Sequence, residues 1–303
     1  MKPKLLIIGS SKIVDEHIKS ALKVGFQLYS LNSTRKNSIN QKKLYKKYKF
    51  QKKFSNWKDA FDSAKNNKNI SVLLAPRIRD NFKILKYLTK GDNLIISEKP
   101  LTTNLRQLNK LKKFKKKIFI TYNRIFYENI QYLKKNIKKP SSVVVKFTDK
   151  NKKNILNNSI HIFSIIYYLF GSVRKKFLLK TKESINMLSL NRNNIPIHFI
   201  YDNNFPETYS IDIRDKNKRY YLKPLEKLKI IRKIEFKYKN NNIKMLIPKE
   251  KIEKQIDLYK INNFKPGFLN QMRYIKRKLD NRGRIGNLEF GVKVIELCKD
   301  FLK

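Results

Sequence analysis

The stretch Ile95-Ile96-Ser97-Glu98-Lys99-Pro100-Leu101 joins an apolar run to a carboxylate, an ammonium group and a proline. The run at residues 93–97 predicts a strand that is buried on both faces, as the strands of a parallel sheet are. Sheets of that kind bind their ligands at the carboxyl ends of the strands. The charged residues that follow this strand are therefore candidates for a binding site.

Strands and helices alternate on both sides of this stretch. The pattern predicts further strands at 5–8, 26–31, 70–74 and 118–122. It predicts helices at 13–22, 57–64, 81–88 and 105–114. Such a series indicates a Rossmann-type, mainly parallel sheet with helices on both faces.

The pattern changes near Pro140, after a predicted helix at 127–137. Short β-branched or aromatic segments at 142–148, 195–201, 208–213, 234–238 and 243–247 predict a mainly antiparallel sheet. Helices are predicted at 160–170, 268–279 and 288–302. The predicted fold class is α/β, with a dinucleotide-binding domain at 1–122 and an α+β domain for substrate and oligomerisation at 123–303. The last helix is expected to pack back on the first domain.

The first strand ends in Gly9-Ser10-Ser11-Lys12-Ile13-Val14, where a dinucleotide-binding protein places G-x-G-x-x-G. Only the first glycine is present, since Ser11 and Val14 occupy the other two positions. A turn of this kind directs backbone N–H groups at a pyrophosphate. We predict cofactor contacts from the turn residues Gly9, Ser10, Ser11, Lys12 and Ile13. The alternative is an ordinary turn between a strand and a helix.

The second strand is followed by Ser33-Thr34-Arg35-Lys36, without the carboxylate that holds the ribose 2′-hydroxyl of NAD. Hydroxyl and basic side chains suit a 2′-phosphate. Ser33, Thr34 and Arg35 therefore favour NADP over NAD as the cofactor. In so lysine-rich a chain, Arg35 and Lys36 also fit a solvated loop.

Taken in order, these landmarks resemble the glucose-fructose oxidoreductase / inositol dehydrogenase family over nearly the whole chain. The residues that carry the resemblance are Ile7-Ile8-Gly9 through His17, Leu74-Ala75-Pro76, Glu98-Lys99-Pro100, Thr121-Tyr122-Asn123-Arg124, the segment 161–171, and Lys265-Pro266-Gly267-Phe268 with Gln271. The resemblance implies hydride transfer between NAD(P) and a sugar, polyol or nucleotide-linked sugar, with a place in surface-polysaccharide synthesis as an analogy.

By that resemblance, Lys99 orients the substrate hydroxyl and stabilises oxyanion charge, and His161 is the general base or acid. The other residues that it implies are Ala75, Pro76 and Glu98 for the cofactor, and Asn123, Arg124 and Asn157 beside Lys99 and His161 for the substrate.

The chain departs from the family at the segment before and after His161. Asn157, Ser159 and Ser164 stand where the family usually has Asp, Gly and Asp. An amide cannot stabilise an imidazolium as a carboxylate does. Asp202 and Glu207 are candidates to replace the missing charge. A second hypothesis is thus a catalytically impaired member that serves as a nucleotide-binding or scaffold protein.

The formal net charge of +48, from 71 Lys and Arg against 23 Asp and Glu, invites a third hypothesis of nucleic-acid binding. Its lysines are spread along the chain among Asn, Ile, Tyr and Phe, which is typical of AT-rich coding sequence. We therefore expect a small sugar-type substrate and no nucleic-acid partner. The antiparallel sheet is the expected surface for a homo-oligomer.

Cys298 is the only cysteine, so no internal disulfide can form, and we expect a reducing, cytoplasmic location. The apolar run at 5–8 is too short for a signal peptide, and no run approaches the about 20 residues of a membrane span. His17, His161 and His198 are far apart in sequence, without neighbouring ligands at metal-binding spacing. We predict no metal site, and we interpret His17 and His198 as core or surface histidines.

Overall fold

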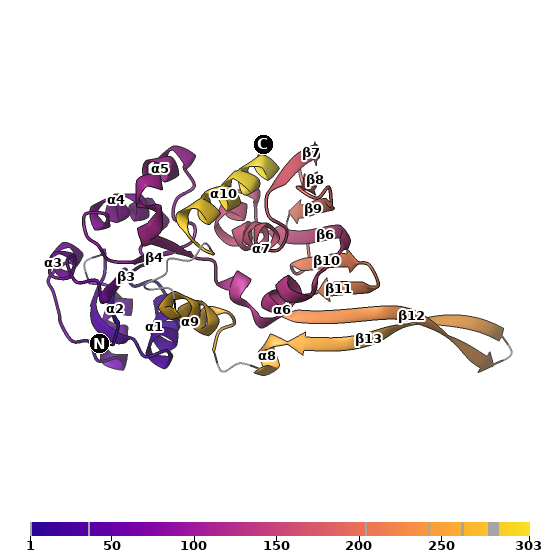
Figure 1. The fold of residues 1–303 in the computed structure, drawn as a ribbon, viewed down its shortest axis with the longest axis horizontal. Helices are drawn as coiled ribbons and strands as arrows, with labels where there is room; N and C mark the ends of the chain where they lie inside the picture. Colours follow the sequence, from indigo (N-terminus) through magenta and orange to yellow (C-terminus); the bar gives the residue numbers. More distant parts are fainter. Residues whose placement is uncertain (1, 36, 204, 242, 262–263, 278–284) are drawn as a thin grey trace. The chain divides into compact units, whose positions relative to one another are not determined.

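The computed structural model describes residues 2–35, 37–203, 205–241, 243–261, 264–277 and 285–303, with the backbone alone at 116, 153, 237–241, 243–247 and 261. The chain forms two compact units (Figure 1), Met1–Phe126 with Asn263–Glu296 and Tyr127–Asn262 with Leu297–Lys303. The sequence placed its domain boundary after Tyr122, close to the first of these divisions, and assigned residues 263–296 to the other domain.

The first unit contains a five-stranded sheet in the order β2-β1-β3-β4-β5, in which every pairing is parallel. Its strands are β1 Lys4–Ile8, β2 Gln27–Asn32, β3 Ile70–Leu74, β4 Ile95–Glu98 and β5 Ile118–Thr121. Residues of β3 are buried at every position, as in a sheet covered on both faces. The predicted Rossmann-type fold is confirmed.

Six helices lie wholly within the described residues of this unit. They are α1 Val14–Lys23, α2 Ile39–Lys47, α3 Trp57–Asp62, α4 Ile78–Leu88, α5 Leu105–Lys110 and α9 Phe268–Arg277, with 3₁₀ turns η1 Lys112–Lys117 and η2 Asn123–Phe126. The sequence did not predict α2, because Leu44 is its only buried residue and no apolar stripe is visible. Its N-terminus is set by the hydroxyl of Ser38, which accepts from the Gln41 N–H.

The second unit contains an eight-stranded sheet in the order β13-β12-β11-β10-β6-β9-β8-β7, antiparallel except between β6 and β9. Its strands are β6 Pro140–Asp149, β7 Val173–Lys180, β8 Ser184–Asn191, β9 Pro196–Asn203, β10 Ser210–Asp215, β11 Lys218–Leu222, β12 Lys227–Asn241 and β13 Ile243–Asp257. The predicted antiparallel sheet is confirmed. The sequence missed β7, β8 and β11, whose Lys and Asn content obscures the alternation of a half-buried strand.

Helices cover one face of this sheet. They include α6 Glu128–Asn136 and α7 Ile160–Phe170. Before α7 the chain forms a 3₁₀ turn, η3 Lys152–Asn154, and a π-helical turn, η4 Ile155–Ser159. A short helix, α8 Leu258–Ile261, follows β13. Phe147 of β6 and Phe199 of β9 pack against Phe163 of α7. The helix α10 Leu288–Leu302 is divided between the units. Its residues up to Glu296 belong to the first unit, where Phe290 contacts Tyr122. Its remaining residues belong to the second unit, where Phe301 contacts Phe163.

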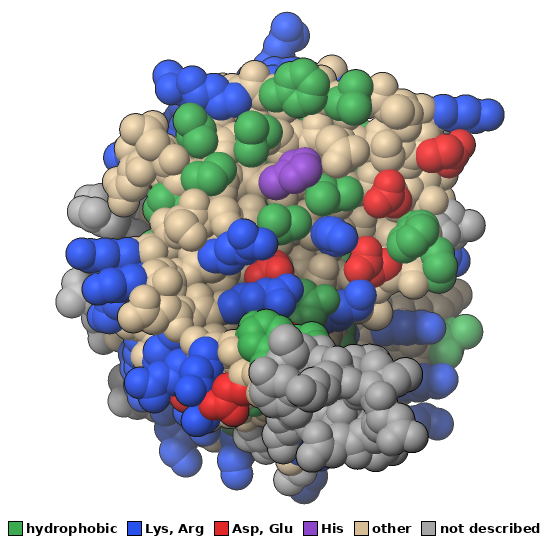
Figure 2. All heavy atoms as spheres, turned by 90° about the vertical axis from the view of Figure 1, so that its right-hand side faces the viewer, with side chains coloured by type: hydrophobic (Ala, Val, Ile, Leu, Met, Phe, Trp, Pro, Cys, Tyr) green, Lys and Arg blue, Asp and Glu red, His purple; other side chains and the backbone are tan. Residues whose placement is uncertain are grey.

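The other face of the eight-stranded sheet is open. Phe177, Leu179 and Leu188 are exposed on β7 and β8, and Leu188 pairs with His198, which alternates with buried residues of β9. Figure 2 shows hydrophobic side chains gathered around a histidine on this side. Among the described residues, no helix has the length and apolar character that crossing a bilayer requires.

Candidate active site

The turn after β1 lies directly against the turn after β3. Gly9 has a φ of +107°, and a Cβ added there would lie 2.3 Å from the carbonyl carbon of Ala75 and 2.6 Å from the nitrogen of Pro76. Only glycine combines this backbone conformation with so close an approach. The structure therefore brings together Gly9, Ala75 and Pro76, all of which the sequence assigned to the cofactor.

The first turn of α1 has no side-chain cap, and the Val14 and Glu16 N–H groups donate to the carbonyls of Ser11 and Ile13 at 3.0 and 3.1 Å. The N-cap residue Ile13 makes no side-chain hydrogen bond, while Ser11 and Lys12 are exposed just before it. An uncapped helix N-terminus after a glycine turn suits the diphosphate of a dinucleotide. Val14 is fully buried, so the core accommodates a side chain where a third glycine is usual. The residues present fit the predicted cofactor.

The turns after β1 and β2 are joined by serine hydroxyls. Ser10 Oγ lies 3.1 Å from Ser33 Oγ and 2.7 Å from Ser38 Oγ, and Ser33 Oγ accepts from the Arg35 N–H at 3.1 Å. Thr34 lies between them in the chain and the Arg35 side chain is exposed. These four predicted cofactor residues are thus neighbours, and Lys36 lies outside the described residues.

Glu98 is held at the end of β4 by two partners. His17 Nε2 lies 2.5 Å from Glu98 Oε1, and the Thr121 hydroxyl donates to the same oxygen at 2.7 Å. The His17 ring is fully buried and meets the Phe268 ring edge-on at 4.9 Å. The sequence interpretation of His17 as a generic core or surface histidine missed this contact. The resemblance was the available signal, because it places a histidine in this helix.

Burial and neighbouring charges both shift the pKa values of Glu98 and Lys99. Burial by itself raises the pKa of Glu98, but the His17 hydrogen bond and charge, the Thr121 hydroxyl and the Lys99 charge together lower it. Burial lowers the pKa of Lys99, and so do the charges of Arg124 and Lys265, while Glu98 opposes them. The site therefore contains a carboxylate held in its ionised form beside a partly desolvated ammonium group.

Neighbouring turns hold the residues around Lys99. The Asn81 side chain donates to the Pro100 carbonyl at 3.4 Å, and the peptide bond between Lys99 and Pro100 is cis. Asn123, which follows β5, donates to the Pro266 carbonyl at 3.3 Å. Asn123 is buried and Arg124 half-buried. Lys99, Asn123 and Arg124 are therefore placed together at the carboxyl edge of the parallel sheet.

In the second unit, His161 lies in the first turn of α7 and is 6% exposed. Asn157 is exposed on the π-helical turn before it. The Ser164 hydroxyl donates to the His161 carbonyl oxygen at 2.7 Å, a bond within the helix. Ser164 is thus engaged with the backbone of α7 through its hydroxyl.

A carboxylate does lie at the start of α7, but it comes from β6. Ser159 is fully buried, and its hydroxyl donates to Asp149 Oδ2 at 3.0 Å and lies 3.0 Å from the Tyr209 hydroxyl. The candidates named from sequence lie elsewhere: Glu207 pairs with Lys223 at 2.8 Å, and Asp202 alternates with the inward-facing Tyr201 on β9. Asp149 is a residue that sequence reasoning missed, because it precedes His161 in a separate strand.

Lys99 and His161 belong to different units, so their pairing across one substrate stays a prediction. Within the described ranges, no three or more His, Cys, Asp or Glu side chains are grouped so as to hold a metal ion.

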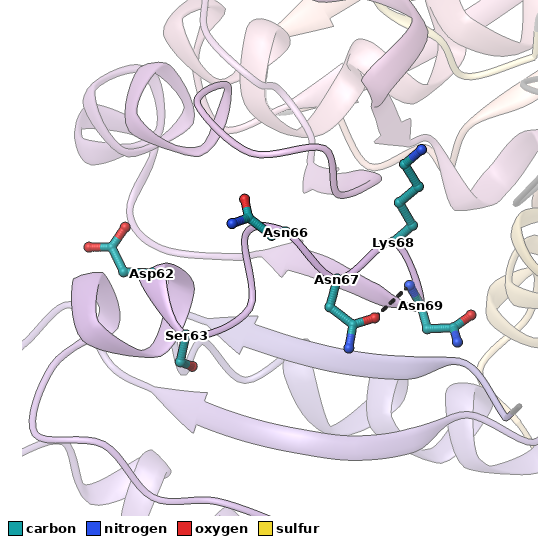
Figure 3. Close-up of a pocket in the computed structure, with 6 residues that line it drawn as sticks. All are labelled: Asp62, Ser63, Asn66, Asn67, Lys68 and Asn69. Atoms are coloured by element: carbon teal, nitrogen blue, oxygen red, sulfur yellow. Dashed lines mark hydrogen bonds between the residues drawn. The ribbon is translucent and has the colours of Figure 1, made fainter.

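The surface hollow in Figure 3, lined by Asp62, Ser63 and residues 66–69, lies before β3, at the amino end of the parallel strands. It is therefore separate from the edge that carries the predicted site.

No family model and no curated protein matches this sequence. Many solved structures share its fold, and three of them are described here. A dehydrogenase (MviM) from Clostridium difficile has a TM-score of 0.76 at 17% identity, covering 100% of this chain and 99% of its own. A putative myo-inositol dehydrogenase from Sinorhizobium meliloti 1021 has a TM-score of 0.71 at 13% identity, with coverage of 99% and 96%. An oxidoreductase from Agrobacterium radiobacter, solved with NAD⁺, L-tartaric acid and magnesium, has a TM-score of 0.72 at 13% identity, with coverage of 99% and 95%.

The two-unit fold, in which a Rossmann unit is joined to a mainly antiparallel sheet, is the fold of solved dehydrogenases. Among these dehydrogenases, the fold is that of the glucose-fructose oxidoreductase / inositol dehydrogenase family, at low sequence identity to its solved members. The resemblance found in the sequence is confirmed at the level of the fold.

Proposed function

We propose that this protein is an NAD(P)-dependent oxidoreductase that transfers hydride between nicotinamide and a hydroxyl or carbonyl of a sugar, polyol or nucleotide-linked sugar. The observation that carries this proposal is the anchoring of Glu98 by His17 and Thr121, which places Lys99 at the carboxyl edge of the parallel sheet. The similar structures support it, since they are dehydrogenases and one was solved with NAD⁺ and a hydroxy acid.

The cofactor is assigned to the first unit. Ser10 through Ile13 would hold the diphosphate with backbone N–H groups. Gly9, whose own N–H donates to the Asn32 carbonyl at 2.9 Å, would allow its close approach, and Ala75 and Pro76 would line the same turn. Ser33, Thr34 and Arg35 would meet the adenosine ribose, and the lack of a carboxylate there favours NADP over NAD. When bound, the nicotinamide supplies the hydride acceptor or donor.

The proton and charge steps are assigned to the chain's own side chains. The Lys99 ammonium would hydrogen-bond to the reacting oxygen and stabilise its negative charge as hydride leaves or arrives. The His161 imidazole would accept the hydroxyl proton in oxidation and return it in reduction. Asp149, bonded to Ser159 two residues before His161, would favour the protonated imidazole electrostatically.

A catalytically impaired, nucleotide-binding or scaffold protein is the second candidate. Two observations favour it: Asn157 is exposed and uncharged, and the Ser164 hydroxyl bonds to the helix backbone.

We also propose that a second copy of the chain covers the open face of the eight-stranded sheet. Its support is the set of exposed apolar side chains Phe177, Leu179 and Leu188 on that face.

Fluorescence titration with NADPH and NADH, followed by turnover of a panel of sugars and polyols, tests the proposal. In Lys99→Met, kcat should fall about 10³-fold, as expected for loss of an oxyanion stabiliser, with the cofactor Kd unchanged. His161→Ala should lower kcat by about 10²–10⁴-fold. Lys83→Met, on the exposed surface of α4, is the matched control. Lack of cofactor binding would reject the enzyme, whereas binding without turnover would support the scaffold.

A further inference from the structure

Three cationic residues of the first unit lie in turns at or near the end of β4. Lys99 follows β4, Arg124 follows β5 in the 3₁₀ turn η2, and Lys265 lies in the turn before α9. The Asn123 side chain donates to the Pro266 carbonyl at 3.3 Å, which fixes the turn that carries Arg124 beside the turn that carries Lys265. The three positions are therefore joined by a defined contact within one unit.

A second chain of contacts connects Lys265 with Lys99. The Lys265 ammonium lies 5.8 Å from the centre of the Phe268 ring, and that ring lies 4.9 Å from the ring of His17. His17 in turn contacts Glu98, the residue before Lys99. The pKa of Lys99 reflects the same proximity. Burial is the largest cause of its lowering, and the positive charges of Arg124 and Lys265 lower it further.

These positive charges meet the negative charge of Glu98, whose Oε1 already accepts from Thr121 and contacts His17. Lys265 is exposed and forms no ion pair with any residue that the structure describes. Holding like charges together costs free energy, which an oxyanion placed among them offsets.

One cation beside the reacting oxygen is enough to orient a neutral polyol, so the additional cations call for another explanation. We infer that the substrate is a sugar or polyol that carries an oxyanion, a carboxylate or a phosphate, and that Lys265 and Arg124 bind this group beside the hydroxyl that Lys99 orients. A guanidinium and an ammonium group together suit such an anion, because both donate charge-assisted hydrogen bonds. This inference rests on the proposed function and narrows its substrate class.

Calorimetric titration with three related probes tests the inference: glucose, glucuronate and glucose 6-phosphate, each with and without saturating NADPH. We expect one of the two anions to bind about tenfold tighter than glucose, the size of one charge-assisted hydrogen bond. Glucuronate as the tighter ligand would indicate a carboxylate, and glucose 6-phosphate a phosphate. Lys265→Gln should remove about tenfold of that preference, whereas Lys83→Gln, which removes the same charge from the protein, should preserve it.

Three results would overturn the inference. Glucose binding as tightly as both anions, or neither anion binding at all, would show that the cations do not select an oxyanion. Equal affinities in Lys265→Gln and Lys83→Gln would show that only the overall positive field matters. A weaker NADPH affinity in Lys265→Gln, with sugar affinity unchanged, would assign Lys265 to the cofactor. Failure of NADPH binding with anion binding intact would reject the proposed oxidoreductase and leave the anion site standing.

Discussion

The surroundings of Lys99 and those of His161 are built in different ways. Lys99 is supported by residues at the ends of adjacent elements of one parallel sheet, with Glu98 fixed by His17 and Thr121. His161 begins a helix of the second unit, and the carboxylate at that helix start comes from Asp149 of β6 through Ser159. The first arrangement follows from topology, because parallel strands end at one edge. The arrangement around His161 depends on the position at which β6 ends, because β6 carries Asp149.

This difference predicts where substitutions are tolerated. Around Lys99, backbone turns approach so closely that particular residue types are required. Around His161, a carboxylate comes from Asp149 on a different strand. Uncharged residues at the motif positions 157 and 164 therefore leave a carboxylate near the start of the helix. The four predictions below test this contrast.

The largest effect on stability is expected from Gly9→Ala. The new Cβ would meet the Ala75 carbonyl carbon at 2.3 Å on a backbone with φ +107°. Backbone strain and overpacking together should lower the free energy of unfolding by about 4 kcal/mol. Urea denaturation measures this loss.

The matched control lies in the other region, at the end of α7. Gly171 also has a positive φ, of +76°, but a Cβ there would meet nothing within 4 Å. Gly171→Ala should therefore cost only the backbone strain, about 2 kcal/mol. Equal losses for the two variants would show that the close approach of the β1 and β3 turns is not needed for stability.

Glu98→Gln should have the next largest effect. The amide keeps the shape but removes the charge that His17 meets at 2.5 Å, and a loss of about 1–3 kcal/mol is expected for an imperfectly satisfied buried partner. Because the pKa of Glu98 is lowered by folding, its stabilisation is present above the ordinary value of 4.5 and is lost as pH falls through the folded pKa.

Unfolding measured between pH 7 and pH 3 checks this sign. The parent protein should lose more stability than Glu98→Gln below about pH 4.5, since the variant lacks that titrating group. Glu289→Gln, on the exposed surface of α10, is the control. Parallel curves for the parent and Glu98→Gln would contradict the role assigned to the pair.

The sequence predicted the parallel unit well because each of its signals is local. The apolar runs that became β1, β3 and β4 are bounded by glycine, proline or charged residues within a few positions, and Leu288–Leu302 formed a helix where its period indicates one. The carboxyl edge that we propose as the ligand-binding site followed from the topology. By contrast, β7 and α2 expose most of their side chains, so they carry little apolar periodicity.

The candidate site was less accessible to sequence reasoning because its contacts join distant segments. His17 and Glu98 are far apart in the chain, and nothing in either segment alone indicates their contact. Asp149 reaches Ser159 because β6 ends beside the turn before α7, and the bond between Asn123 and Pro266 joins the turns that carry Arg124 and Lys265. Such contacts depend on the fold that brings the segments together, and the separate sequence patterns do not specify it.

A smaller, kinetic effect is expected from Asp149→Asn. The carboxylate bonded to Ser159 would favour a protonated His161, so its loss should lower kcat about tenfold, at the low end for acid–base catalysis. In the oxidation direction, the acid limb of the pH–rate profile should move to lower pH, because the imidazole base would stay neutral further down. Asp202→Asn, whose side chain alternates with the inward-facing Tyr201, should change neither quantity. An unmoved acid limb in Asp149→Asn would leave only a structural role for that residue.

The smallest effect is expected in the turn after β2, where Arg35 is exposed to solvent. Arg35 is exposed and its backbone N–H is fixed to Ser33, so the side chain can meet a 2′-phosphate only in a solvent-screened position. Arg35→Gln should therefore raise the Kd for NADPH by about fivefold, the scale of one exposed ion pair, and leave the Kd for NADH unchanged. Lys42→Gln, exposed on α2, controls for the general positive field, and higher salt should shrink the difference between NADPH and NADH. An equal change in both affinities would show that Arg35 contributes to nucleotide binding without distinguishing the two cofactors.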